Sequence, residues 1–181
     1  MRSRTAEWFE TKIRYEKTME DGLQKKITEQ YVVDALSFTE AENAIIEEVS
    51  AYISGDFTVM DIKKATYKEI FFSENPRDDR WYKVKLQFII IDEKSGKEKL
   101  SAVNYVVQSN TLQNAVKNVE EVMNKGMQDW KLASIAETNI MDVFEHDGTR
   151  HVNKPEEDER PEFEDALKAE LEAGQEKEEA M

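Results

Sequence analysis

The sequence predicts an α+β protein in which a ββαβ unit is duplicated, giving a mainly antiparallel sheet with two helices packed on it. Two stretches carry this prediction: WFETKIRY at residues 8–15 and, 73 positions later, WYKVKLQF at residues 81–88. Both alternate apolar and polar residues, which is typical of a half-buried strand. Both lead into a glycine turn, a second alternating segment and a helical pattern. We therefore expect repeats at 8–72 and 81–145, joined by a polar linker at 73–80.

Each repeat opens with a predicted β-hairpin. Asp21-Gly22 and Ser95-Gly96 stand between alternating segments, where glycine supplies the positive φ that a tight turn needs. The return segments KKITEQYVVDAL and KEKLSAVNYVVQ share Tyr-Val-Val. One such unit buries little surface alone, so we expect the two to share a sheet or to press their sheets together in a single domain, 1–154.

A helix and a closing strand follow each hairpin. Thr39 has Glu42 three residues later, the spacing of a capping box, and Thr111 is a good N-cap residue. Apolar residues at i, i+4 and i+8 predict the buried helix faces, which are Ala41, Ile45 and Val49, then Ala115, Val119 and Met123. Gly55 and Gly126 mark the expected helix ends. Residues 56–72 and 129–144 are each predicted to form one closing strand.

The C-terminal segment, residues 155–181, concentrates the negative charge of the chain. It holds 12 acidic and 3 basic residues, against 27 and 22 in residues 1–154, and the whole chain carries a net charge of -14. This composition predicts a disordered or marginally helical tail. Phe163, Leu167 and Leu171 are four residues apart, so the tail either offers an apolar face to protein partners or only keeps the chain soluble.

The first strand of each repeat presents a polar face with a tryptophan and several cations. Because side chains alternate between the faces of a strand, Phe9, Ile13 and Tyr15 belong to the core. The opposite face holds the candidate nucleic-acid-binding residues Trp8, Lys12, Arg14, Trp81, Lys83 and Lys85. Rings beside cations suit single-stranded DNA or RNA, since bases stack while phosphates meet the cations. The alternative is that the tryptophans cover a sheet end and the lysines are ordinary solvated residues.

The function expected from this pattern is non-enzymatic binding of single-stranded nucleic acid, with the acidic tail as a competitor. The alternative is a protein-interaction or small-ligand-binding module with no nucleic-acid role. A homodimer is also expected, because antiparallel sheets leave edges that pair readily. The chain has no cysteine and no run approaching a membrane span, so we expect a cytoplasmic protein without membrane contact.

Catalytic and cofactor signatures are absent from the sequence. There is no phosphate-binding glycine loop and no nucleophile motif, so we expect neither an enzyme nor a cofactor. His146 and His151 lack the ligand spacing of a metal site. Paired carboxylates in a cleft could still act as an acid and a base, and the candidates are Asp61, Glu69, Glu137 and Asp142, although one sequence cannot place their strands together.

The segments WFETKIRY, KKITEQYVVDALSFTEAE, WYKVKLQF and SNTLQNAV resemble the domain-of-unknown-function 4494 family of Bacteroides-group bacteria and their phages. The likeness covers residues 8 to about 145 and leaves the acidic tail outside. It implies a small cytoplasmic or phage-encoded protein with no assigned activity and no catalytic residues to carry over.

Overall fold

Nine strands and two helices occur in residues 1–146, which are the residues that the computed structural model describes. Five strand pairs are antiparallel and two are parallel, so the predicted α+β class is confirmed. The predicted acidic tail lies outside the described residues. The elements are β1 (Arg2–Thr5), β2 (Trp8–Thr18), β3 (Gln24–Asp34), α1 (Phe38–Ser50), β4 (Phe57–Lys64), β5 (Glu69–Phe72), β6 (Arg80–Ile91), β7 (Glu98–Ser109), α2 (Leu112–Met123), β8 (Trp130–Glu137) and β9 (Ile140–Phe144).

The strands form two sheets: the four-stranded sheet takes β9 from the second half of the chain, and the five-stranded sheet takes β5, with β1 at its edge, from the first half. The four-stranded sheet has the order β4-β2-β3-β9, and the five-stranded sheet has the order β1-β5-β7-β6-β8. The exchanged strands are the parallel ones, since β9 pairs with β3 and β5 pairs with β7. Neither half can therefore complete its sheet alone.

The prediction of one closing strand per repeat is wrong, because residues 56–72 and 129–144 each form two strands that enter different sheets. The break lies at the first residue after the edge strand. The amide of Ala65 donates to the carbonyl of Trp8, and the amide of Thr138 donates to the carbonyl of Trp81, both at 2.9 Å. These bonds satisfy the backbone where the chain leaves its sheet, so the bend needs no glycine or proline.

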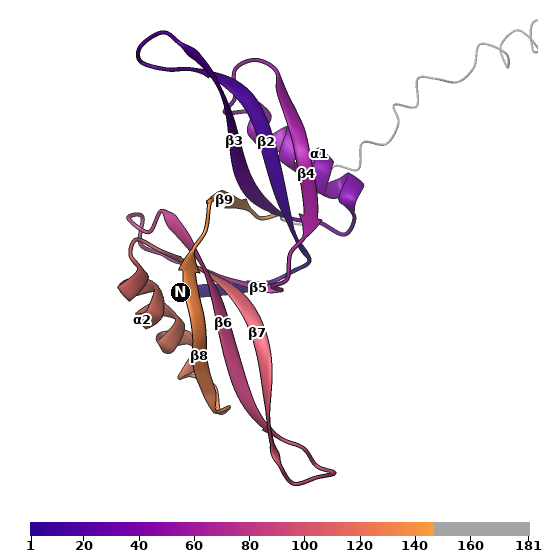
Figure 1. The fold of residues 1–181 in the computed structure, drawn as a ribbon, viewed down its shortest axis with the longest axis vertical. Helices are drawn as coiled ribbons and strands as arrows, with labels where there is room; N and C mark the ends of the chain where they lie inside the picture. Colours follow the sequence, from indigo (N-terminus) through magenta and orange to yellow (C-terminus); the bar gives the residue numbers. More distant parts are fainter. Residues whose placement is uncertain (147–181) are drawn as a thin grey trace, which may run out of the picture. The chain divides into compact units, whose positions relative to one another are not determined.

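Each helix covers one face of one sheet: α1 contacts β2, β3 and β4, and α2 contacts β7 and β8 (Figure 1). The predicted faces are confirmed, with Ala41, Ile45, Val49, Ala115 and Val119 buried and Met123 packed against them. Thr111 is the N-cap of α2, as predicted.

The predicted start of α1 is wrong, since its N-cap is Ser37 and not Thr39. The Ser37 hydroxyl accepts from the amide of Glu40 at 3.2 Å, and the Glu40 carboxylate accepts from the amide of Leu36. This reciprocal pair resembles a capping box shifted by two residues, and it leaves Thr39 inside the first turn.

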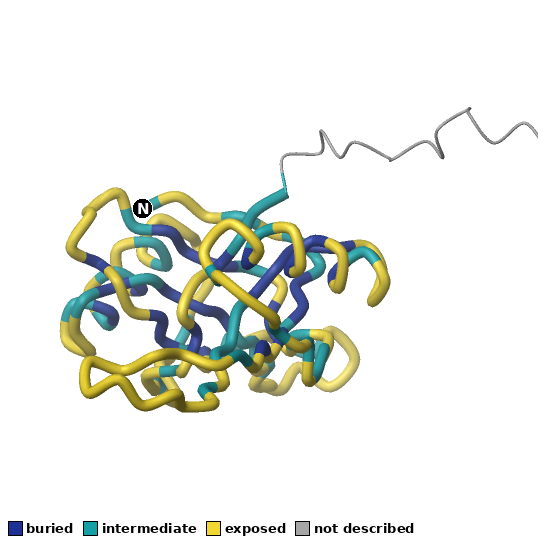
Figure 2. Tube along the Cα trace, turned by 90° about the horizontal axis from the view of Figure 1, so that it is seen from above, coloured by how far each residue is buried: buried dark blue, intermediate teal, exposed yellow. Residues whose placement is uncertain are grey.

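Three apolar clusters form the core, one under each helix and one between the two sheets. The third cluster joins Trp8 and Val32 of the four-stranded sheet to Ile70, Trp81 and Val106 of the five-stranded sheet. Figure 2 shows the buried positions gathered inside and the exposed ones around them. The faces that the helices leave open thus pack against each other where β2 and β6 begin.

The short strand β1 adds an ionic clamp to this junction. Arg2 donates to the Glu145 carboxylate at 2.8 Å and 2.5 Å. Arg4 pairs with the buried carboxylate of Asp34 and donates to the carbonyl of His146 at 2.6 Å. These contacts tie the edge of the five-stranded sheet to the ends of β3 and β9 in the four-stranded sheet.

Candidate functional site

The two tryptophans proposed to stack bases are buried, so that part of the site prediction is wrong. Trp8 is 1% exposed and Trp81 is 2% exposed. Alternation places them correctly on the face opposite the helices, but here that face is covered by the other sheet. The ring of Phe72 lies between them, with its centroid 6.4 Å from Trp8 and 5.6 Å from Trp81. Neither indole face is open to a base.

The cations predicted on β2 are exposed, but they share their face with carboxylates. Lys12 is opposite Asp61 of β4, whose carboxylate pairs with Lys63 at 3.0 Å. Arg14 donates to the hydroxyl of Thr28 at 3.4 Å. The open face of the four-stranded sheet is therefore mixed in charge.

Lys83 and Lys85 differ in how far they reach solvent. Lys83 is half-buried, and its ammonium lies 5.7 Å from the ring centroid of Tyr67. Tyr67 donates to the Glu10 carboxylate at 3.1 Å, and burial followed by the charge of Glu10 raises the pKa of its phenol. Lys85 is exposed, with Asn104 and Ser134 as its cross-strand neighbours.

Strand register adds one cation that sequence reasoning missed. Lys131 of β8 is exposed and pairs with Gln87, so it lies on the same open face as Lys85. The pairing register of β6 with β8 shifts between Lys85 and Leu86, which changes the residues of β8 that face the helix. The alternation of apolar and polar residues in the sequence does not predict this shift. In the described strands β6, β7 and β8, the carboxylate paired on this open face is Glu98, near the hairpin end opposite Ile91.

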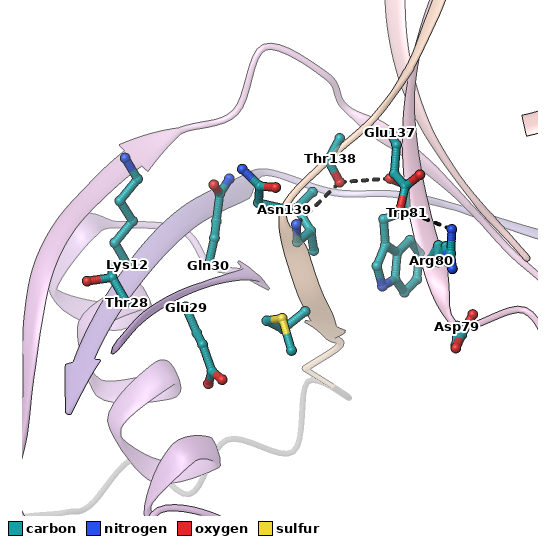
Figure 3. A pocket seen from close by; sticks show the side chains of 12 residues that line it. Lys12, Thr28, Glu29, Gln30, Asp79, Arg80, Trp81, Glu137, Thr138 and Asn139 are labelled. Atoms are coloured by element: carbon teal, nitrogen blue, oxygen red, sulfur yellow. Dashed lines mark hydrogen bonds and ion pairs between the residues drawn. The ribbon is translucent and has the colours of Figure 1, made fainter. Parts of the chain in front are cut away.

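A pocket of about 600 Å³ lies beside the junction of the two sheets (Figure 3). One wall comes from β2 and β3, and the other from β6 and the segment between β8 and β9. Arg80 and Glu137 form an ion pair at 3.5 Å on the second wall. Its lining holds the cations Lys12 and Arg80, the carboxylates Glu29, Asp79 and Glu137, and the indole of Trp81.

The four candidate carboxylates lie on four different strands, and the pocket described above is lined by one of them, Glu137. Glu69 starts β5, and Asp142 accepts from the amide of Val143 at 2.8 Å. Residues 1–146 hold no group of three histidine or carboxylate side chains that would suit a metal ion. Nor does any helix in these residues have the length and apolarity to cross a bilayer. His151 lies outside the described residues.

The family model described as Domain of unknown function (DUF4494) matches residues 7–146. The chain belongs to the DUF4494 family. The match begins just before β2 and ends at His146, so the family domain comprises both helices and every strand except β1. No curated protein and no solved structure matches the chain.

Proposed function

We propose that this DUF4494 protein is a non-catalytic binding module that holds a nucleic-acid strand by its phosphates on the open face of β6, β7 and β8. One observation carries the proposal: Lys85 and Lys131 share an exposed face whose central neighbours are Asn104, Ser134 and Gln87, with no carboxylate opposite them in these strands. Cations gathered on one face allow a chain of net negative charge to bind a polyanion. Stacking on Trp8 or Trp81 has no part in it.

The direct test is binding of a fluorescein-labelled poly-dT oligonucleotide to the full chain, measured by anisotropy at several salt concentrations. The test variant carries Lys85→Gln and Lys131→Gln together. The control is Lys26→Gln, which changes a lysine on the other sheet whose ammonium is 3.7 Å from the Glu16 carboxylate. Each lost phosphate contact should reduce the slope of log K against log salt by about 0.7. A folded double variant with unchanged affinity and slope would refute the proposal.

A second candidate function is protein interaction, which the far end of the β6–β7 hairpin favours. Ile91 is 71% exposed, Leu100 is 50% exposed and Ile90 is 40% exposed. Apolar side chains gathered at one end of a hairpin are typical of a surface that a protein covers. The predicted homodimer is one way to cover them. Binding that resists salt but weakens in Ile91→Ser would favour this candidate over nucleic acid.

We also propose that the chain is an internal duplication of a ββαββ unit with exchanged last strands. The backbone bond between Ala65 and Trp8 recurs between Thr138 and Trp81, 73 positions later. The register shift after Lys12 recurs after Lys85, at the same offset. An experimental structure in which the two halves differ in strand order would refute this origin.

A further inference from the structure

Four strands lie at the edges of the two sheets in residues 1–146: β4 and β9 in the four-stranded sheet, and β1 and β8 in the five-stranded sheet. An edge strand presents a row of backbone groups that another strand can bind, and proteins protect such edges with charge or by keeping them short. β1 has four residues and is held by the ion pairs of Arg2 and Arg4, and β9 has five residues. The long edges are β4 and β8, with eight residues each.

The two long edges are alike in backbone and differ in charge. Each is antiparallel to the first strand of a hairpin, and each contains one register shift, so a bulge does not distinguish them. After the shift β4 reads DIKK, where β8 reads SIAE. Lys63 and Lys64 are exposed, and lysines of this kind protect an edge from a further strand. In β8, the five residues between Lys131 and Glu137 carry no charge, so this edge lacks the protection that β4 has.

The backbone of β8 offers hydrogen-bonding groups on its outer side. The amide of Thr138 donates to the carbonyl of Trp81 at 2.9 Å, so the backbone bonds of Thr138 are directed at β6. Because the direction of these groups alternates along a strand, the N–H and C=O of Ile135 and Glu137 point away from β6. Six of the eight residues of β8 are exposed, and Leu132 is 37% exposed. The outer side of β8 is therefore open to a strand.

The charges at the two ends of β8 indicate which strand fits this edge. Lys131 lies near the start of the strand, and Glu137 ends it. A second β8 that runs antiparallel brings the Lys131 end of each copy to the Glu137 end of the other, whereas a parallel copy brings like charges together. A twofold interface needs a surface that is complementary to itself. In the antiparallel direction, β8 meets this requirement.

We propose that β8 pairs antiparallel with β8 of a second copy of this chain, so that the five-stranded sheets of the two copies form one continuous sheet. The outward backbone groups of Ile135 and Glu137 then find partners, and Leu132 is covered by the other copy. One pair of eight-residue strands makes a small interface, so the dimer is a weak one. This pairing does not require nucleic-acid binding, and it places the dimer contact away from the hairpin end that contains Ile91.

Sedimentation velocity of the full chain, from micromolar to submillimolar concentrations, measures the dissociation constant of the dimer. The test variant, Ala136→Lys with Glu137→Lys, gives β8 the two lysines that end β4. Because the Lys131 end of each copy then meets lysines, this variant should raise the dissociation constant about tenfold or more. The matched control, Glu42→Lys with Asn43→Lys, makes the same change of charge at exposed positions of α1 and should leave the dimer unchanged.

Two outcomes of this experiment would overturn the proposal directly. One is a wild-type chain that stays monomeric at submillimolar concentration, and the other is a dimer that the test variant leaves intact. A third variant, Ile91→Ser, distinguishes the edge from the hairpin end, where Ile91 is 71% exposed. It should not change the dissociation constant. Loss of the dimer in Ile91→Ser would place the contact at the hairpin end and contradict pairing through β8.

Amide hydrogen exchange tests the same edge in the unaltered chain. The amides of Ile135 and Glu137 should exchange slowly at high protein concentration and quickly after dilution, because only a second copy protects them. The amides of Ile62 and Lys64 point outwards from β4 by the same alternation, and they should exchange quickly at both concentrations. Exchange at Ile135 and Glu137 that does not change with concentration would contradict the pairing, even if the lysine variant of β8 did not fold.

Discussion

Replacing Trp8 by alanine tests whether the cluster between the sheets makes residues 1–146 one cooperative unit. Trp8 is 1% exposed and packs near Phe72, and its N–H donates to the Lys68 carbonyl at 3.1 Å. Deleting a buried aromatic side chain costs about 3–5 kcal/mol. Leaving the Lys68 carbonyl without its donor adds about 1 kcal/mol. We therefore expect a loss of about 4–6 kcal/mol, a large share of the roughly 5–15 kcal/mol that stabilises a typical domain.

Urea unfolding followed by far-UV circular dichroism measures this loss, and calorimetry checks it. At about 2–4 °C per kcal/mol, Tm should fall by roughly 8–24 °C. Because the cluster contains residues of both sheets, the variant should still unfold in one transition. The control is Tyr52→Ala, which removes an aromatic ring that is 74% exposed and should change stability by less than about 0.5 kcal/mol. A Trp8→Ala loss below about 1 kcal/mol, or a wild-type protein whose two sheets melt separately, would refute the shared core.

Two further predictions concern the edges of the fold. Hydrogen bonding to Arg2 holds the pKa of Glu145 below its ordinary value in the folded protein. The ionised Glu145 therefore contributes fully to the free energy of unfolding above the unfolded-state pKa of about 4.3, and this contribution is lost as pH falls through the lower folded-state pKa. The urea midpoint of Glu145→Gln should therefore be lower than that of the wild type at neutral pH, and the difference between the two midpoints should shrink in acid. A difference that does not change with pH would exclude the ionic contact. Ser37→Ala should cost about 0.5–2 kcal/mol in the same assay, whereas Thr39→Ala should cost less, and the reverse order would return the helix start to Thr39.

Local patterns were sufficient for the elements that are stabilised within one half of the chain. The hairpin turns contain Gly22 and Gly96 with φ of 80° and 64°, as their sequence predicts. The helix faces follow the spacing of Ala41, Ile45 and Val49. In each case the residues that make the contact are near one another in sequence, so periodicity and turn chemistry carry the information.

The same reasoning fails where contacts are distant in sequence. Alternation fixes the face of Trp8 but cannot say that the second sheet covers that face. The sequence also does not predict the exchange of β5 and β9 between the sheets. The chain bends at Ala65 and Thr138, where no glycine or proline marks a break in the strand pattern. Lys131 shares a face with Lys85 only through a register shift. The structure therefore exposes Lys12, Arg14 and Lys85 but buries Trp8 and Trp81, and nucleic-acid binding by the lysines stays a prediction.

The opening repeat of the sequence has a structural cause, which is the packing of both tryptophans between the two sheets. Trp8 and Trp81 both stand at the start of a strand next to a hairpin partner, and both enter the cluster that joins the sheets. A role in packing requires both rings and is indifferent to whether each N–H finds a protein acceptor or water. The Trp8 N–H donates to the carbonyl of Lys68 at 3.1 Å, whereas the Trp81 N–H has no acceptor in residues 1–146 and its nitrogen keeps contact with solvent. If packing is the whole role of both rings, Trp81→Phe should lower the free energy of unfolding less than Trp8→Phe, because only the second change leaves a carbonyl without its donor. Urea unfolding of the two variants measures this difference, and the reverse order would contradict it.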